Sequence, residues 1–134
     1  MATVPMRIGE LSERTGLGQR AIHYYESLGL IHPVQREGKG YRYFDEQAVV
    51  RIEKIQVLKQ LGLSLEEIAT VIDAYFEDGT MVKGKRKVLA ILKKHLAAVD
   101  EKLGDLTKHR AELCANISKI QSILDNISRT HRKE

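Results

Sequence analysis

The last third of the chain carries an apolar residue at alternating steps of three and four. This repeat runs from Leu89 to Ile127, and Arg110 is its one polar position. Steps of three and four average about 3.5 residues, which is the spacing of a coiled-coil seam. A helix of about 45 residues would be roughly 68 Å long, too long for the segment before it to cover. The sequence therefore predicts a long helix that needs a partner along its length.

The simplest partner for this helix is the same helix of a second copy, because two-fold dimers dominate soluble homo-oligomers. The residues predicted to form the dimer interface share the seam spacing and are Leu89, Leu92, Leu96, Val99, Leu103, Leu106, Leu113, Ile117 and Ile120. The alternative is a helix that folds back on itself, which would need a break near Gly104 or Asn116. One seam does not distinguish parallel from antiparallel pairing.

Residues 7–29 read as two short helices joined by a tight turn. The turn is Thr15–Gly18, and its two glycines allow backbone angles that other residues resist. The second helix is expected from about Gln19 to Leu28, with Gly29 as its left-handed cap. Such a pair of helices is typical of a helix-turn-helix. The positions expected to be buried are Ile8, Leu11, Ile22 and Leu28.

A β-hairpin and two further helices are predicted after this pair. Residues 34–43 form two strand-like runs around a Gly-Lys-Gly tip. Asp45 is the expected N-cap of a third helix that ends near Gly62. Ser64 and Glu67 form a capping box for a fourth helix that reaches about Phe76, followed by a linker at residues 78–80. The buried stripe expected on the third helix is Val49, Ile52, Ile55 and Leu58.

The charge of the chain is unevenly distributed. Residues 1–80 contain 9 Lys and Arg against 12 Asp and Glu, a net charge of −3, whereas residues 81–134 contain 13 against 6, a net charge of +7. The sum is the formal charge of +4. If the helix-turn-helix binds nucleic acid, its contacts must therefore depend on the placement of a few basic residues rather than on bulk charge.

Composition excludes several classes of protein. The single cysteine, Cys114, allows no intrachain disulfide. No run approaches 18 uncharged apolar residues, and the start of the chain lacks the basic and apolar regions of a secretion signal. We therefore expect a cytoplasmic protein outside the membrane. Since the sequence has no glycine-rich phosphate loop and no nucleophile elbow, we expect neither an enzyme nor a cofactor.

Four motifs in a fixed order resemble the MerR family of bacterial transcription regulators. The motifs are residues 6–16, 20–30, 40–43 and 61–68. The resemblance implies a mainly α fold, with a winged helix-turn-helix DNA-binding domain at residues 1–78 and a long dimerisation helix at residues 79–134 that forms an antiparallel coiled coil. It also implies a homodimer that binds a two-fold sequence in double-stranded promoter DNA. Such a dimer controls transcription by distorting the promoter spacer, so that RNA polymerase engages both promoter elements.

Basic and aromatic residues on the second helix and the hairpin are the candidate DNA contacts. They are Gln19, Arg20, His23, Tyr24, Tyr25, Arg36, Lys39, Tyr41 and Arg42. Arg20 and His23 share a helix face and could reach base edges or phosphates in the major groove. His23 stands where many family members carry arginine. A tyrosine hydroxyl offers a phosphate an uncharged hydrogen bond, which favours Tyr24 as a contact.

Some of these candidates have a second interpretation as packing residues. One of two adjacent tyrosines on an amphipathic helix must point partly inward, so Tyr25 is either a packing residue or a DNA contact. Since side chains alternate along a strand, Tyr41 and Tyr43 are expected to cover the core and Arg42 to contact DNA from the opposite face. The basic residues 85–87 are expected to be a solvated helix start.

The sequence does not identify an effector. A soft-metal site needs two or more thiolates or imidazoles, so Cys114 would need His95, His109 or the partner subunit, and we expect no metal site. Cys114 is either a small apolar residue beside the seam or a redox-sensitive thiol. The residues expected near any small organic effector or redox site are Tyr75, Phe76, Arg110 and Cys114.

Two function classes remain at this point. The first is a DNA-binding transcription regulator, which the ordered motifs favour. The second is a coiled-coil adaptor whose head binds protein instead of DNA, which the negative net charge of residues 1–80 would suit. The salt dependence of DNA binding separates the two classes.

Overall fold

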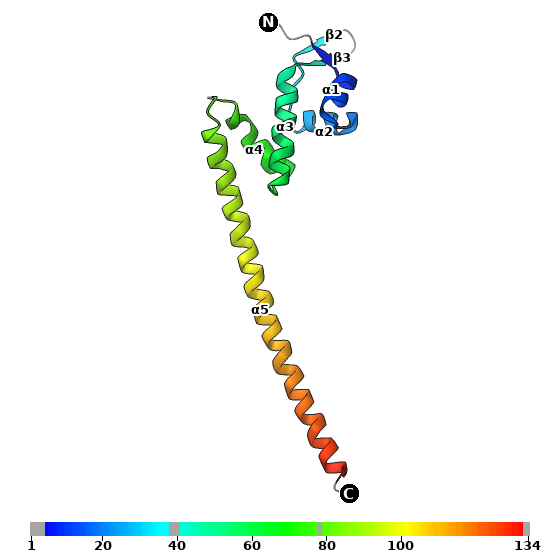
Figure 1. Cartoon of the computed structure of the whole chain (residues 1–134), viewed down its shortest axis with the longest axis vertical. Coiled ribbons are helices and arrows are strands. Elements are labelled where there is room, and N and C mark those ends of the chain that lie inside the picture. The colour runs from blue at the N-terminus through cyan, green and yellow to red at the C-terminus, as the bar shows by residue number, and fades with distance from the viewer. Residues whose placement is uncertain (1–4, 38–40, 78, 133–134) are drawn as a thin grey trace. The chain divides into compact units, whose positions relative to one another are not determined.

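A computed structural model of the chain describes residues 5–37, 41–77 and 79–132. Its elements, in chain order, are β1 (Met6–Arg7), α1 (Ile8–Thr15), α2 (Gln19–Ser27), β2 (Gln35–Glu37), β3 (Tyr41–Phe44), α3 (Glu46–Gln60), α4 (Leu65–Tyr75) and α5 (Val82–Arg132) (Figure 1). The chain divides into two compact units, Met1–Leu92 and Lys93–Glu134. The mainly α fold is as predicted.

The helix-turn-helix forms where the glycines predict it. α1 ends at Gly16, whose φ of 76° is left-handed and whose N–H bonds to Ser12 O at 2.9 Å. The Ser12 hydroxyl donates to Leu17 O at 2.7 Å, which closes the turn across the break. α2 then begins at Gln19 and is followed by Gly29, with a φ of 75°. Because glycine adopts these angles without a Cβ clash, the local sequence fixes both helix ends.

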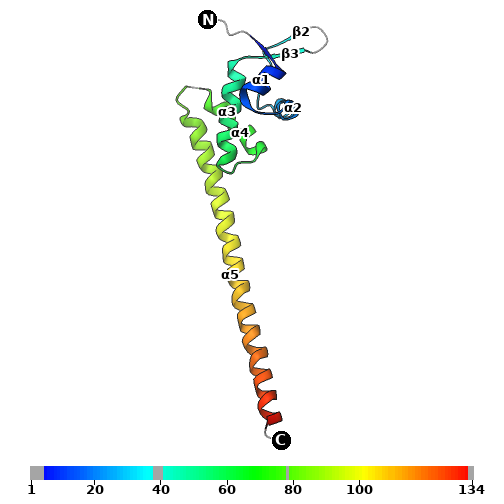
Figure 2. The same cartoon turned by 45° about the vertical axis from the view of Figure 1, so that its right-hand side comes forward.

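The wing, which is the hairpin of β2 and β3, is part of a three-stranded antiparallel sheet in the order β1-β3-β2. The hairpin of β2 and β3 was predicted, but β1 was not, because two residues carry no readable alternation. Met6 pairs with Phe44 and Arg7 with Tyr43, so β1 anchors the hairpin to the start of α1. Both views show β2 and β3 beside each other at one end of this unit (Figure 2). The hairpin tip, residues 38–40, lies outside the described residues.

The prediction that the tyrosines of β3 cover the core is not met at Tyr43, which is only half-buried, whereas Phe44 is fully buried. For Tyr41, whose side chain is outside the described part of the structure, it stays a prediction. Since side chains alternate, Arg42 lies on the same strand face as Phe44, the face that turns toward the helices. The sequence misled because tyrosine and phenylalanine follow each other and either could have been the core residue.

α3 and α4 begin at their predicted caps. The Asp45 carboxylate accepts from the Gln47 N–H at 3.0 Å. The Ser64 hydroxyl accepts from the Glu67 N–H at 3.1 Å, and the Glu67 carboxylate accepts from the Ser64 N–H at 2.9 Å, which completes the capping box. All four residues predicted to be buried on α3 are buried, namely Val49, Ile52, Ile55 and Leu58.

A buried arginine that the sequence did not reveal joins α3 to its surroundings. Arg51 Nε donates to Leu30 O at 2.7 Å, and Arg51 Nη2 donates to Asp73 Oδ1 of α4 at 2.8 Å. The guanidinium carbon also lies 5.5 Å from the centre of the Phe76 ring. Arginine is mostly exposed in proteins, so the sequence alone did not indicate that Arg51 would be buried.

α5 is continuous from Val82 to Arg132. It passes through Gly104 and Asn116 without a break, so the alternative of a helix folded back on itself is wrong. Its first turns pack on the preceding elements, β1 to α4, which we call the head. Val88 is buried in the core of the head, and Ile91 and Leu92 lie against that core. No described helix combines the length and the apolar character needed to cross a membrane.

Candidate nucleic-acid interface

α2 presents a polar face to solvent and an apolar face to the core. Ile22 is fully buried and Tyr25 is only 3% exposed, whereas the Tyr24 ring is 48% exposed. Tyr25 is therefore a packing residue, and it is removed from the candidate DNA contacts because its ring belongs to the core. The exposed residues of this helix that were predicted as contacts are Gln19, Arg20, His23 and Tyr24.

The wing contributes Arg42, whose guanidinium reaches back to α2. Arg42 Nη1 lies 2.5 Å from Glu26 Oε2 and 3.1 Å from His23 Nδ1. Together with Ser27, these residues line an open hollow between the helix and the strand. The structure thus brings together Arg42 and His23, two of the predicted contacts.

The remaining wing candidates can be placed only in part. Arg36 lies in β2 opposite Arg42, and Glu37 lies opposite Tyr41. The side chains of Arg36 and Tyr41 are outside the described part of the structure, and Lys39 lies outside the described residues altogether. These three residues stay predictions.

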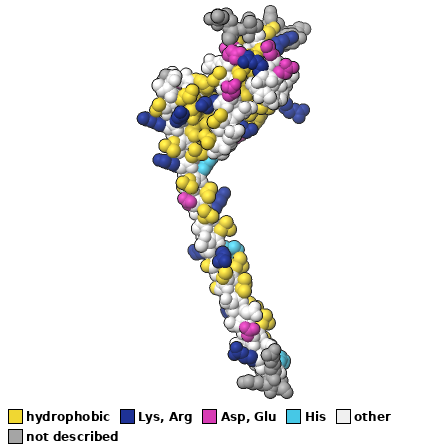
Figure 3. All heavy atoms as spheres, in the orientation of Figure 1, with side chains coloured by type: hydrophobic (Ala, Val, Ile, Leu, Met, Phe, Trp, Pro, Cys, Tyr) yellow, Lys and Arg dark blue, Asp and Glu magenta, His cyan; other side chains and the backbone are white. Residues whose placement is uncertain are grey.

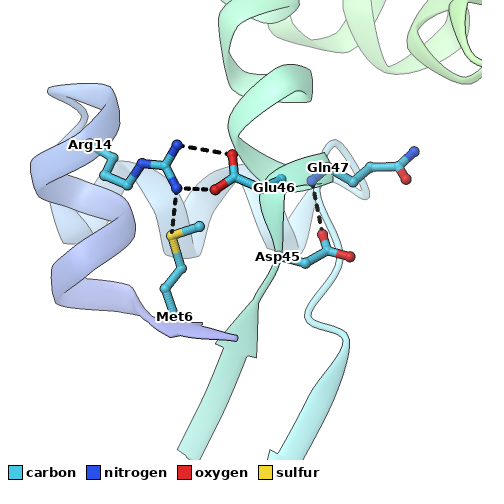
Figure 4. Close-up of polar contacts among 5 residues, drawn as sticks. All are labelled: Met6, Arg14, Asp45, Glu46 and Gln47. Carbon is cyan, nitrogen blue, oxygen red and sulfur yellow. Dashed lines mark hydrogen bonds and ion pairs between the residues drawn. The ribbon is translucent and has the colours of Figure 1, made fainter. Parts of the chain in front are cut away.

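An exposed ion pair links α1 to α3. The Arg14 guanidinium makes two bonds to the Glu46 carboxylate, one of them from Nη2 to Oε2 at 2.9 Å, and Nη1 also lies 4.0 Å from Met6 Sδ (Figure 4). The hydrogen bond to Glu46 raises the pKa of Arg14, and the same bond lowers the pKa of Glu46. The pair joins the end of α1 to the first residue of α3, and so helps to hold the helix-turn-helix in place.

The residues predicted near an effector have mainly structural surroundings. Tyr75 is buried, and burial raises the pKa of its hydroxyl. Lys54 Nζ lies 4.7 Å from the centre of the Tyr75 ring, and the Phe76 ring packs beside Arg51. On the other unit, Arg110 and Cys114 are exposed. Within the described residues, no group of three or more His, Cys, Asp or Glu could hold a metal ion.

The seam side chains on α5 are largely exposed within the chain (Figure 3). Leu106 is 63% exposed and Ile117 is 65% exposed. Near the same helix face, an open apolar groove is lined by Leu113, Asn116, Ile117, Ile120 and Gln121. Leu92 differs from the other seam residues, because it is half-buried against the head. The described part of the chain thus leaves the seam without a cover.

Sequence reasoning missed two charged residues of this region. Glu26 lies three residues after His23 on α2, and this spacing could have shown that both share a face. Glu46 follows the Asp45 cap, and no local pattern indicates that it would reach Arg14, 32 residues earlier in the chain. Ion pairs between distant elements depend on the tertiary fold and leave no periodic trace in the sequence.

Two family models match the chain. One, described as "MerR HTH family regulatory protein", matches residues 6–75, and one described as "MerR, DNA binding" matches residues 49–115. Together they cover the helix-turn-helix, the wing, α3, α4 and more than half of α5.

Similar proteins carry related descriptions. The HTH-type transcriptional regulator HmrR of Rhizobium leguminosarum bv. viciae is 38% identical over 108 residues, with 81% of each chain covered. The nodulation protein NolA of Bradyrhizobium elkanii is 29% identical over 137 residues, which cover 95% of this chain. The chain spans about half the length of the NolA proteins that it matches, with 58%, 53% and 41% of three of them covered.

A solved structure shares the fold. The transcription regulator PbrR691 from Ralstonia metallidurans CH34, in complex with lead(II), superposes with a TM-score of 0.63 at 29% identity, and 81% of each chain is covered. A MerR family regulator from Bacillus thuringiensis gives a TM-score of 0.51 at 26% identity, covering 81% of this chain and 99% of that one.

Proposed function

The chain belongs to the MerR family of DNA-binding transcription regulators, and on that premise we propose that it binds a two-fold promoter sequence as a homodimer and controls transcription by distorting the promoter spacer. The family consists of regulators and not of enzymes. The proposed activity belongs to the bacterial cytoplasm, where promoter DNA and RNA polymerase are found. The observation that carries the proposal is the uncovered seam of α5 joined to a helix-turn-helix with a polar exposed face.

The proposed DNA surface combines α2 with the wing. Arg20 and His23 are exposed on one face of α2 and address base edges in the major groove. Tyr24 and Arg42 address phosphates, which set the register of the protein on the duplex. Gln19, Arg36, Lys39 and Tyr41 complete the proposed contact set.

The proposed dimer contact is the α5 seam. Eight of its predicted interface residues are between 48% and 65% exposed in the single chain, namely Leu89, Leu96, Val99, Leu103, Leu106, Leu113, Ile117 and Ile120. Apolar surface of this extent is unfavourable in water, and a second copy of the helix would bury it at the spacing of a coiled coil. We propose that the two helices run antiparallel, as the family resemblance implies. Leu92 would contribute to the head and to the interface at once.

Dimerisation supplies a physical reason for the distortion of the promoter. Two heads held by one coiled coil present their recognition helices at a fixed separation. A duplex whose half-sites do not match that separation must bend or untwist to engage both heads, and the binding energy of the second head offsets the deformation energy. RNA polymerase would then bind a promoter whose spacer has a changed geometry. The regulator would thus act on the polymerase through the shared promoter DNA.

A selection experiment tests this function. The purified full chain is incubated with a library of random duplexes, and bound sequences are recovered and amplified over several rounds. We expect enrichment of a two-fold symmetric sequence whose binding weakens steeply as salt is raised, because phosphate contacts release counterions. Recovery of unenriched sequences, or of none, would contradict the proposal and favour the adaptor whose head binds protein.

A further inference from the structure

One cluster of polar and charged side chains lies between α2, the proposed recognition helix, and the wing. A single nitrogen of Arg42, Nη1, approaches both Glu26 and His23, at 2.5 Å and 3.1 Å. The two acceptors lie three residues apart on α2 and so share one face of that helix. The cluster therefore connects two elements that are separated by 16 and 19 residues in the chain.

The position of Glu26 is unusual for a surface that meets DNA. Its side chain is only 11% exposed, so its carboxylate has lost most of its contact with water, whereas the Arg42 side chain is 32% exposed. A carboxylate near phosphates is repulsive unless a cation offsets it. Here the cation is the Arg42 guanidinium, which faces the Glu26 carboxylate directly.

The bonds to α2 leave part of the guanidinium available. Both use Nη1, and Nε and Nη2 of Arg42 have no hydrogen-bond partner in the described part of the chain. Arginine has five N–H donors in a rigid planar fork. Fixing one nitrogen therefore fixes the direction of the others, so the donors that remain are oriented before DNA arrives.

We propose that Glu26 is a positioning residue of the DNA-binding surface, whose carboxylate holds the Arg42 guanidinium beside His23 so that wing and recognition helix meet the duplex in one fixed orientation. The inference rests on the proposed DNA-binding function. In a sequence-specific complex the phosphates stand at fixed places, so a held Arg42 meets one of them without losing further side-chain freedom. In a non-specific complex the protein has no fixed register on the duplex. There a mobile Arg42 can pair with a phosphate as well as a held Arg42 can. Glu26 thus increases sequence preference without increasing general affinity.

The test compares Glu26→Ala with wild type in the full chain. The probes are the duplex that the wild-type protein itself selects from a random library and a scrambled duplex of equal length. We expect the variant to bind the selected duplex about tenfold more weakly, and to bind the scrambled duplex as well as wild type or more tightly, since a negative charge has been removed. Glu26→Gln keeps an oxygen that can accept from Arg42, so it should restore part of the preference.

Two controls separate positioning from damage to the fold. Glu13→Gln removes a negative charge from an exposed site on α1 and should leave the ratio of the two affinities unchanged. In an Arg42→Ala background, Glu26→Ala should no longer lower the ratio, because the group that it positions is absent. A general loss of folding would lower both affinities in either background and would show in the circular dichroism melting curve.

The outcomes distinguish the inference from the function beneath it. A wild-type protein that selects no sequence overturns both. If the wild-type protein shows a clear preference, either of two results leaves the function in place and overturns the role of Glu26. In the first, Glu26→Ala keeps the wild-type ratio of the two affinities. In the second, Glu26→Ala lowers that ratio by the same factor with Arg42 present and in the Arg42→Ala background.

Discussion

The backbone of Gly84 lies against the ring of Tyr75. A Cβ built on Gly84 would stand 2.5 Å from Cδ2 and 2.6 Å from Cγ of that ring. Tyr75 is the last residue of α4 and Gly84 lies in the first turn of α5, so this contact sets how closely that first turn approaches α4. The ring is buried and has little room to move away.

The first prediction compares the same substitution at two glycines of α5. In Gly84→Ala, overpacking costs about 1–3 kcal/mol and helix propensity returns about 1 kcal/mol at most, so the variant should be destabilised by up to about 2 kcal/mol. Gly104→Ala meets nothing within 4 Å in the chain and should raise stability by up to about 1 kcal/mol. Thermal melts followed by circular dichroism measure both, and a shift of the two variants in the same direction would contradict the packing described here.

Local sequence rules were sufficient for most helix boundaries of this fold. Gly16 and the Ser64 capping box act through neighbouring backbone groups, so their effect can be read without the tertiary structure. The seam of α5 was equally readable, because its period extends over many turns.

Most of the failures concern contacts between distant parts of the chain. β1 exists only because Met6 finds Phe44, and Arg51 is buried only because Leu30 and Asp73 supply partners. For the candidate site, the sequence identified exposed His23 and Arg42 but not Glu26, because the ion pair depends on how the hairpin folds back toward α2.

The second prediction concerns pH and the Arg14–Glu46 pair. The hydrogen bond from Arg14 lowers the pKa of Glu46. The pair therefore stabilises the fold above the pH at which an ordinary glutamate titrates, about 4.3, and this contribution is lost as the pH falls through the lowered pKa. Glu46→Gln should lower the melting temperature at pH 7, and its difference from wild type should shrink in acid. A difference that persists unchanged down to pH 2 would contradict this account.

The third prediction separates two kinds of DNA contact. Arg42→Ala removes a proposed phosphate contact, so it should weaken binding to both the selected and the scrambled duplex and lower the salt slope by about 1. The loss should be larger on the selected duplex, because the proposed positioning by Glu26 favours only that complex. Arg20→Ala removes a proposed base contact, so it should cost about 1–3 kcal/mol on the selected duplex and relax the preference at one base position. Fluorescence anisotropy at several salt concentrations measures both. Equal losses on the two duplexes for both variants would refute the division of roles.

The fourth prediction places a charge in the seam. Leu106→Glu should weaken dimerisation by about a hundredfold or more, because a carboxylate would be buried opposite the partner helix. Lys108→Glu, two residues further along the same helix and outside the seam spacing, is the matched control and should leave the dimer intact. Sedimentation equilibrium gives both association constants. A Leu106→Glu variant that dimerises as tightly as wild type would show that the seam is not the interface.

The most direct test of the proposed dimer on DNA is the mass of the complex between the full chain and its selected duplex, measured by sedimentation at low and moderate salt. We expect two chains on each duplex and an affinity that falls steeply as salt rises. One chain on each duplex, or an affinity that does not change with salt, would contradict it.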